Sequence, residues 1–254
     1  MPNQSVDMLA INESRLDSSI SSKEIGIPGY VIERNDRNRN GGGVALYIRN
    51  TIDYDRDETL TLSSLELEWL CVKVKNPRSK PFLVATWYKP PSSGINLMDT
   101  FETLLEKLES QGIEINILGD LNCNVNATPC DHHTSRLLEI CNVFQYQQLI
   151  DQPTRITKVS STIIDLFLTN DAANFSHYGV SEIGISDHNL IYAIRKIPSI
   201  KARPRVIESR QYRDFDRSKF REDLMSIPWG SIDIYSDPNL SWKIWKETFL
   251  SMHL

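Results

Sequence analysis

The chain alternates short apolar runs with polar turns, and this alternation limits the folds available to it more than any other feature. Each run has at most eight residues and is bounded by Gly, Pro, Asn or Asp, which is typical of β-strands. The predicted strands are MLAIN (8–12), GVALYI (43–48), EWLCVKV (68–74), PFLVATWY (81–88), INILGD (115–120), TIIDLFLT (162–169) and NLIYAI (189–194).

Two other segments repeat apolar residues at helical spacing. Residues 96–112 are predicted to form a helix that stops at Gly112, and residues 134–149 to form a second helix that starts at Thr134 or Ser135. Many strands with few helices indicate an α+β domain with a layered, sandwich-like architecture.

The composition of the sequence changes near residue 197, where basic residues become frequent. Residues 195–221 carry ten Lys or Arg and three Asp or Glu, a local net charge of +7, whereas the whole chain has −5. We therefore predict a folded domain at 1–197 and, at 198–254, a basic linker that ends in one short amphipathic helix. Trp242, Trp245 and Phe249 are expected on the apolar side of that helix. Basic residues of the linker, among them Arg203 and Arg205, are predicted to contact nucleic-acid phosphates.

The composition also bears on where the protein works. No apolar run approaches the roughly 20 residues of a membrane helix, and the N-terminus lacks the pattern of a secretory signal. The four cysteines show no close paired spacing, which is typical of reduced thiols in an intracellular protein.

Polar residues stand where several predicted strands end. The run INILGD ends in Asp120, and Asn122 and Asn124 follow. In extended backbone these three side chains share one face, where they can orient a water molecule and bind a phosphate oxygen. A turn explains the same residues equally well, so both interpretations stay open here. Glu13 follows MLAIN in the same way.

Asp165 is harder to explain as a surface residue. It lies inside the apolar run TIIDLFLT, where an unpaired carboxylate is costly to bury. The later motif SDH supplies Asp187 and His188. We predict that His188 pairs with Asp165 and that Asp187 faces a metal ion or water. A set rich in carboxylate and amide oxygens favours Mg²⁺ or Mn²⁺ over Zn²⁺.

Taken together, the motifs of this chain resemble those of a known group of enzymes. INES, GGGVALYI, WYKPP, GDLNCN, TRIT with IIDLFLTN, and SDHNLI occur in an order and spacing that resemble the endonuclease/exonuclease/phosphatase superfamily of DNase I-like enzymes. The residues within these motifs are similar to those in the endonuclease domains of non-LTR retrotransposons, which precede a reverse transcriptase. The resemblance covers roughly residues 6–196.

The resemblance implies a four-layer α/β/β/α sandwich of two facing β-sheets flanked by helices. It also implies that Mg²⁺ or Mn²⁺ is the cofactor, that DNA is the partner and that the protein works in the nucleus. Implied roles for individual residues follow the motifs. Glu13 resembles the principal metal ligand and Asp187 a second acidic residue near the metal. Asp120 resembles the residue that positions or deprotonates water, assisted by Asn122. Tyr88 resembles a tyrosine that reaches the scissile phosphate, and His188 a phosphate-stabilising imidazole oriented by Asp165.

One departure from the family pattern bears on function. The family has a strand before the one matched by MLAIN, and only seven residues precede Met8 here, so we expect a truncated sheet and low stability. Two function classes stay open: an active DNA-nicking endonuclease, and a catalytically impaired remnant that binds DNA without cleaving it. A phosphatase of small molecules shares the chemistry.

Three other motifs have simpler explanations. Asp131-His132-His133 spells the signature of another phosphoesterase class, but it is better explained as the polar start of a helix. The cysteines and histidines lack the paired intervals of a zinc site. Gly41-Gly42-Gly43 lacks the Lys-Ser/Thr of a P-loop and is predicted to form a turn.

Overall fold

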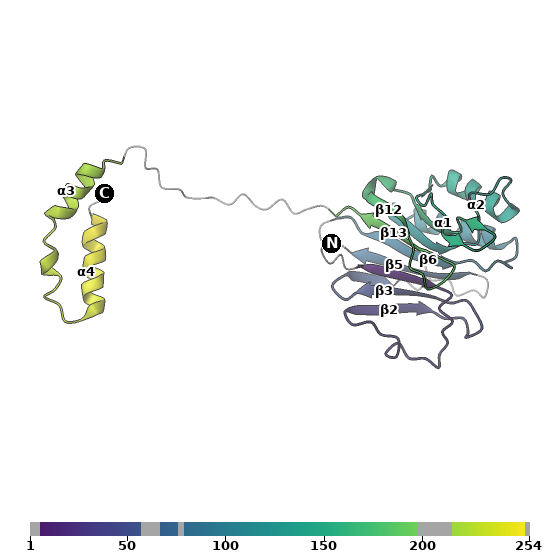
Figure 1. Ribbon diagram of the computed structural model, residues 1–254, viewed down its shortest axis with the longest axis horizontal. Helices are drawn as coiled ribbons and strands as arrows, with labels where there is room; N and C mark the ends of the chain where they lie inside the picture. The colour runs from purple at the N-terminus through teal and green to yellow at the C-terminus, as the bar shows by residue number, and fades with distance from the viewer. Residues whose placement is uncertain (1–5, 57–66, 76–78, 198–214, 252–254) are drawn as a thin grey trace. The chain divides into compact units, whose positions relative to one another are not determined.

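The computed structural model describes residues 6–56, 67–75, 79–197 and 215–251 of the chain. The chain divides into two compact units, Met1–Ile200 and Lys201–Leu254 (Figure 1). No helix in these described ranges is long and apolar enough to cross a membrane.

A six-stranded sheet forms the centre of the first unit. Its order is β4-β5-β6-β7-β11-β8. The strands span Asp53–Arg56 (β4), Glu68–Lys75 (β5), Phe82–Tyr88 (β6), Glu114–Asp120 (β7), Asp165–Thr169 (β11) and Gln147–Gln148 (β8). All neighbours are antiparallel except β6 and β7, which are parallel and are joined by helix α1 (Leu97–Glu109). A parallel pair needs such a crossover connection, so α1 lies against the sheet that it connects.

Smaller sheets complete the unit. The strands β1 (Met8–Asn12), β3 (Val44–Arg49) and β2 (Tyr30–Asn35) pair in that order. The strands β12 (Phe175–Ser181) and β13 (Leu190–Arg195) form an antiparallel pair. A third pair consists of β9 (Arg155–Ile156) and β10 (Ser161–Thr162).

Two apolar clusters place these elements in layers. One face of the six-stranded sheet, including Trp69 and Trp87, packs against Phe101 of α1 and against α2 (His132–Val143). The other face, including Leu70 and Val72, packs against β3. Figure 1 shows β5 and β6 between the two helices and the strands β2 and β3. Burial on both faces explains why β5 and β6 are apolar along most of their length. The predicted pair of facing sheets with flanking helices is confirmed.

Except for 162–169, the predicted strands agree with the structure to within one residue at each end, whereas both predicted helices end earlier than expected. Helix α1 ends at Glu109, and α2 ends at Val143, so that residues 147–148 of the second predicted helix form β8 instead. The predicted strand 162–169 is split, because β10 ends at Thr162 and β11 begins at Asp165. Strands β2, β4, β8, β9 and β12 were not predicted from the sequence, and in β2 and β12 polar residues conceal the strand pattern.

The second unit contains the predicted helix and one that was missed. Helix α4 (Pro238–Ser251) stacks Trp242 on Trp245 and Trp245 on Phe249, each pair with ring centroids 5.1 Å apart. Helix α3 (Arg217–Ser226) is strongly polar, and the sequence analysis assigned it to the linker.

Candidate active site

Three polar side chains lie at one edge of the six-stranded sheet. The parallel strands β6 and β7 end at Tyr88 and Asp120, so these residues reach the same edge. Strand β11 runs antiparallel to β7 and begins at Asp165, opposite Asp120 in the pairing register. The directions of the three strands therefore bring Tyr88, Asp120 and Asp165 to the same edge of the sheet, although they are far apart in the sequence.

His188 pairs with Asp165 beside this edge. The Nδ1 atom of His188 lies 2.9 Å from Oδ2 of Asp165 and 3.2 Å from Oδ1, so the predicted contact is present. This hydrogen bond raises the pKa of His188 above its ordinary value because the carboxylate stabilises the imidazolium form.

Thr154 forms hydrogen bonds to the backbone near both members of this pair. Its buried Oγ1 accepts hydrogen bonds from the backbone N–H groups of Ile164 and Asp165, at 3.1 and 3.0 Å. Its carbonyl oxygen accepts the N–H of Asn189, the residue after His188, at 2.7 Å. The sequence analysis missed Thr154, although it begins the quoted motif TRIT.

Asp120 is a buried carboxylate in a negatively charged neighbourhood. Only 9% of its surface is exposed. Burial, and then the charge of Asp165, raise the pKa of Asp120 to about 6. One potential ligand atom from each of Asp120, Asp165 and His188 lies within 4.8 Å of the others. A divalent cation fits these residues, because it would relieve the repulsion between two crowded carboxylates.

Glu13 follows β1 and lies near enough to this group for its charge to act on Asp120. The Tyr88 hydroxyl donates a hydrogen bond to Glu13, and the Arg15 guanidinium lies 3.2 Å from the Glu13 carboxylate. The bond from Tyr88 is the main cause that lowers the pKa of Glu13. Burial, reinforced by Glu13, raises the pKa of Tyr88. The Tyr88 hydroxyl is therefore directed at Glu13.

Asp187 has a different partner from the one expected. The Nε atom of Arg155 lies 2.8 Å from its carboxylate, and both side chains are about half exposed. The hydrogen bond from Arg155 lowers the pKa of Asp187. Asp187 is thus engaged in an ion pair beside His188, and it is not part of the group formed by Asp120, Asp165 and His188. The sequence analysis missed Arg155.

Of the two interpretations left open for Asp120, Asn122 and Asn124, the structure shows the turn and not a shared face of an extended strand. Strand β7 ends at Asp120, and Asn122 has a positive φ of 46°, so the chain turns there. Asn122 donates to the carbonyl oxygen of Lys89 at 2.9 Å, while its N–H donates to Asp120 at 3.1 Å. The Oδ1 of Asn124 accepts the backbone N–H of Ile163 at 3.2 Å and joins the turn to the segment before β11. Arg203 and Arg205 lie outside the described residues.

Comparisons with known proteins bear on the fold of the chain. Residues 82–192 match a protein-family model described as endonuclease-reverse transcriptase. No curated protein matches the chain in sequence. Among solved structures, the chain is similar to the endonuclease domain of TRAS1, a telomere-specific non-LTR retrotransposon. The TM-score is 0.57 at 15% identity, covering 68% of this chain and 83% of that one.

Two further solved structures show the same architecture. The 3'-5' exonuclease NExo of Neisseria meningitidis has a TM-score of 0.57 at 13% identity, with 76% of this chain and 90% of that one covered. An AP endonuclease from Archaeoglobus fulgidus has a TM-score of 0.52 at 14% identity, with 75% and 89% covered. The chain has the endonuclease/exonuclease/phosphatase fold. The resemblance noted in the sequence is confirmed.

Within this endonuclease/exonuclease/phosphatase fold, Asn12 links the two facing sheets at the site. Its Oδ1 accepts the backbone N–H of Asp120 at 3.0 Å, and its Nδ2 donates to Thr86 of β6 at 3.2 Å. The quoted motif INES contains Asn12, but only the contact between the sheets reveals this role.

The Asp131-His132-His133 triplet takes no part in the site. Asp131 is the N-cap of α2, and its side chain accepts the N–H of Thr134 at 2.8 Å. The expected polar start of a helix is confirmed.

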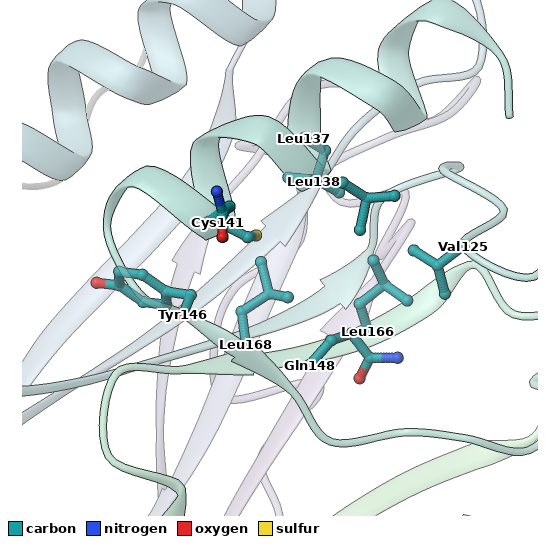
Figure 2. Close-up of a pocket in the computed structure, with 9 residues that line it drawn as sticks. Val125, Leu137, Leu138, Cys141, Tyr146, Gln148, Leu166 and Leu168 are labelled. Atoms are coloured by element: carbon teal, nitrogen blue, oxygen red, sulfur yellow. The ribbon is translucent and has the colours of Figure 1, made fainter.

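An apolar cavity of about 220 Å³ lies on the helix side of the sheet. Figure 2 shows Leu137, Leu138 and Cys141 of α2 facing Leu166 and Leu168 of β11 across it. Burial raises the pKa of the Cys141 thiol to about 12, so the thiol stays protonated at neutral pH. The cavity is therefore a packing space of the endonuclease/exonuclease/phosphatase fold, separate from the polar edge.

Proposed function

We propose that the protein hydrolyses phosphodiester bonds and nicks DNA with the help of Mg²⁺ or Mn²⁺. The observation that carries this proposal is the juxtaposition of a buried carboxylate, Asp120, with a hydrogen-bonded Asp165–His188 pair. Phosphodiester hydrolysis needs both a group that accepts a proton from water and positive charge on the phosphate oxygens.

The individual residues have complementary tasks in this proposal. With its pKa near 6, Asp120 is mostly ionised at neutral pH and can take a proton from the attacking water. His188, whose imidazolium form Asp165 stabilises, donates to a phosphate oxygen as negative charge develops there. Asn122 orients the water or a phosphate oxygen.

Glu13 is the proposed ligand of the cation, which would lie beside Asp120, and Tyr88 fixes the Glu13 carboxylate. When bound, the cation supplies positive charge to the scissile phosphate. Asp187 and Arg155 form the polar rim beside His188, where Arg155 provides a guanidinium for a DNA phosphate.

DNA as the substrate, a nuclear location and a reverse transcriptase partner belong to the same proposal. They are supported by the match of residues 82–192 and by the similarity to the TRAS1 endonuclease domain. In this interpretation, residues 198–254 form the spacer before a reverse transcriptase, and Arg203 and Arg205 add phosphate contacts.

A plasmid-nicking assay tests the proposal. The purified chain should convert supercoiled plasmid to open circles with Mg²⁺ and not with EDTA. Asp120→Asn and His188→Ala should each slow nicking by about 10²-fold or more. His132→Ala is the matched control, because this histidine is exposed and takes no part in the proposed chemistry, and the variant should nick at the wild-type rate.

Retained DNA binding without Mg²⁺-dependent nicking would favour the impaired remnant instead. Equal loss of nicking in the His132→Ala control would show that the site has been assigned to the wrong residues.

A further inference from the structure

A buried carboxylate without a role in the proposed chemistry lies beneath the glycine turn Gly41–Gly43. Glu68 begins β5 and is only 6% exposed. Its carboxylate accepts a hydrogen bond from the backbone N–H of Gly43 and lies 2.7 Å from the guanidinium of Arg37. In the pairing of β5 with β6, Glu68 stands opposite Tyr88, the residue that bonds to Glu13.

The shape of the glycine turn depends on this carboxylate. Gly42 and Gly43 have φ values of +74° and +82°, which side chains rarely allow. A Cβ atom on Gly42 would lie 2.5 and 2.6 Å from the two carboxylate oxygens of Glu68. The backbone of the turn therefore closes directly over Glu68.

The glycine turn also forms hydrogen bonds to Ser14 and Arg15, the two residues that follow Glu13. The carbonyl oxygen of Gly43 accepts the N–H of Ser14 at 3.0 Å, and that of Gly42 accepts the N–H of Arg15 at 2.9 Å. Glu13 and Arg15 both have positive φ values, 52° and 53°. Non-glycine residues keep this unfavourable conformation only where surrounding contacts impose it, and the two hydrogen bonds from the turn are such contacts.

We propose that Glu68 is a positioning residue that sets the Glu13 carboxylate for cation binding through the glycine turn. This inference rests on the proposed function, because Glu13 is the proposed cation ligand. Glu68 fixes the Gly43 backbone, Gly42 and Gly43 fix Ser14 and Arg15, and these neighbours fix the backbone of Glu13, whose side chain Tyr88 contacts. Gly41–Gly43 thereby acquires a function that its sequence alone did not suggest.

Glu114 is the matched control for Glu68. Its side chain is 8% exposed, compared with 7% for Glu68, and it also lies 2.7 Å from an arginine, Arg195. It begins β7, six residues before Asp120, which is about 20 Å along a strand. Glu68→Ala and Glu114→Ala should therefore both lower the melting temperature, while only Glu68→Ala should disturb Glu13.

Two measurements on the full chain separate positioning from stability. The first is Mn²⁺ affinity by electron paramagnetic resonance, below the melting temperature of every variant. Glu68→Ala should weaken binding at least about tenfold, which corresponds to about 1.4 kcal/mol, and Glu114→Ala should leave it unchanged. Adding Glu68→Ala to Glu13→Gln should weaken binding no further, because both changes act through one carboxylate.

The second measurement is amide hydrogen exchange of the metal-free protein. Ser14 and Arg15 should lose protection in Glu68→Ala and keep it in Glu114→Ala. Glu68→Gln should restore most of this protection, because its amide oxygen still accepts the Gly43 N–H. If the alanine variant does not fold, Glu68→Leu takes its place, because leucine fills a similar volume and cannot accept the Gly43 N–H, and it should show the same loss of protection.

Unchanged protection of Ser14 and Arg15 in Glu68→Ala, or an equal loss in Glu114→Ala, would overturn the inference. The exchange experiment needs neither DNA nor turnover. Absence of Mg²⁺-dependent nicking by the wild-type chain would therefore count against the proposed function, while exchange would still decide the role of Glu68.

Discussion

At the scale of single residues, the negative charge of Asp120 that the proposed chemistry uses also lowers the stability of the folded protein. Its pKa rises from 3.8 to about 6 on folding, so the folded protein binds this proton more tightly than the unfolded chain. Ionisation of Asp120 therefore opposes folding above pH 6, and this cost disappears below pH 3.8. A difference of this size corresponds to at most about 3 kcal/mol.

Asp120→Asn should therefore stabilise the metal-free protein while it abolishes nicking. We expect the free energy of unfolding at pH 7.5 in EDTA to rise by about 1–3 kcal/mol, because the amide carries no charge near Asp165. Urea unfolding at pH 7.5 and at pH 4 measures this, and the gain should shrink at the lower pH. A variant less stable than the wild type at pH 7.5 would contradict the role of charge crowding.

The Asp165–His188 pair gives a second prediction at this scale. Asp165→Asn should lower the pKa of His188 toward its ordinary value, because the hydrogen bond from Asp165 is the main cause that raises it. Above neutral pH the variant should hold less imidazolium and nick about 10²-fold more slowly. Titration of the histidine resonances by nuclear magnetic resonance measures the shift, with the remaining histidines as internal references. An unshifted His188 would separate it from Asp165.

At the scale of secondary-structure elements, the site depends on how closely β7 approaches its neighbours. Gly119 has a φ of +151°, and a Cβ atom there would collide with the carbonyl oxygen of Trp87 and lie 2.9 Å from Oδ1 of Asn12. The same Asn12 oxygen accepts the N–H of Asp120. A small residue at position 119 therefore allows the two sheets to meet beside Asp120.

Gly119→Ala should disturb both stability and activity. We expect a loss of at least about 1 kcal/mol in the free energy of unfolding, because the backbone of β6 must move to accept the methyl group. Nicking should also slow in protein that is still folded. Gly94→Ala is the control, since no atom lies within 4 Å of the position of its Cβ. Thermal melting and plasmid nicking of both variants provide the comparison, and equal behaviour would show that the sheets can separate without cost.

At the scale of the whole molecule, charge is distributed unevenly along the chain. The body carries the carboxylates of the site, and residues 195–221 carry a net charge of +7 within a chain of −5. A basic segment of this kind strengthens binding to any DNA sequence, because each phosphate contact releases counterions.

Arg203→Ala combined with Arg205→Ala should weaken DNA binding and flatten its dependence on salt. If both side chains contact phosphates, the slope of log K against log salt should fall by about 2. Fluorescence anisotropy with two unrelated DNA sequences should show the same loss for both. Lys243→Ala with Lys246→Ala is the control of equal charge on α4. An unchanged slope in the arginine variant would show that this charge is only solvated.

The sequence by itself determined the local features of the fold. Strand β1 and, within one residue, β5, β6 and β7 were predicted correctly, because alternation and turn residues are properties of neighbouring positions. The burial cost of one carboxylate also led correctly to the contact between Asp165 and His188. Polar strand residues hid β2 and β12, since only pairing with other strands stabilises them there.

Tertiary structure decided which polar residues meet and what each contacts. The register of β11 on β7 places Asp165 opposite Asp120, and burial, together with the charge of Asp165, raises the pKa of Asp120. The turn after Asp120, one of the two interpretations open from the sequence, directs Asn124 to the backbone of Ile163, and Arg155 forms an ion pair with Asp187. Such contacts join residues that are distant in the sequence. They depend on strand order, register and backbone approach, which the pattern of neighbouring residues does not specify.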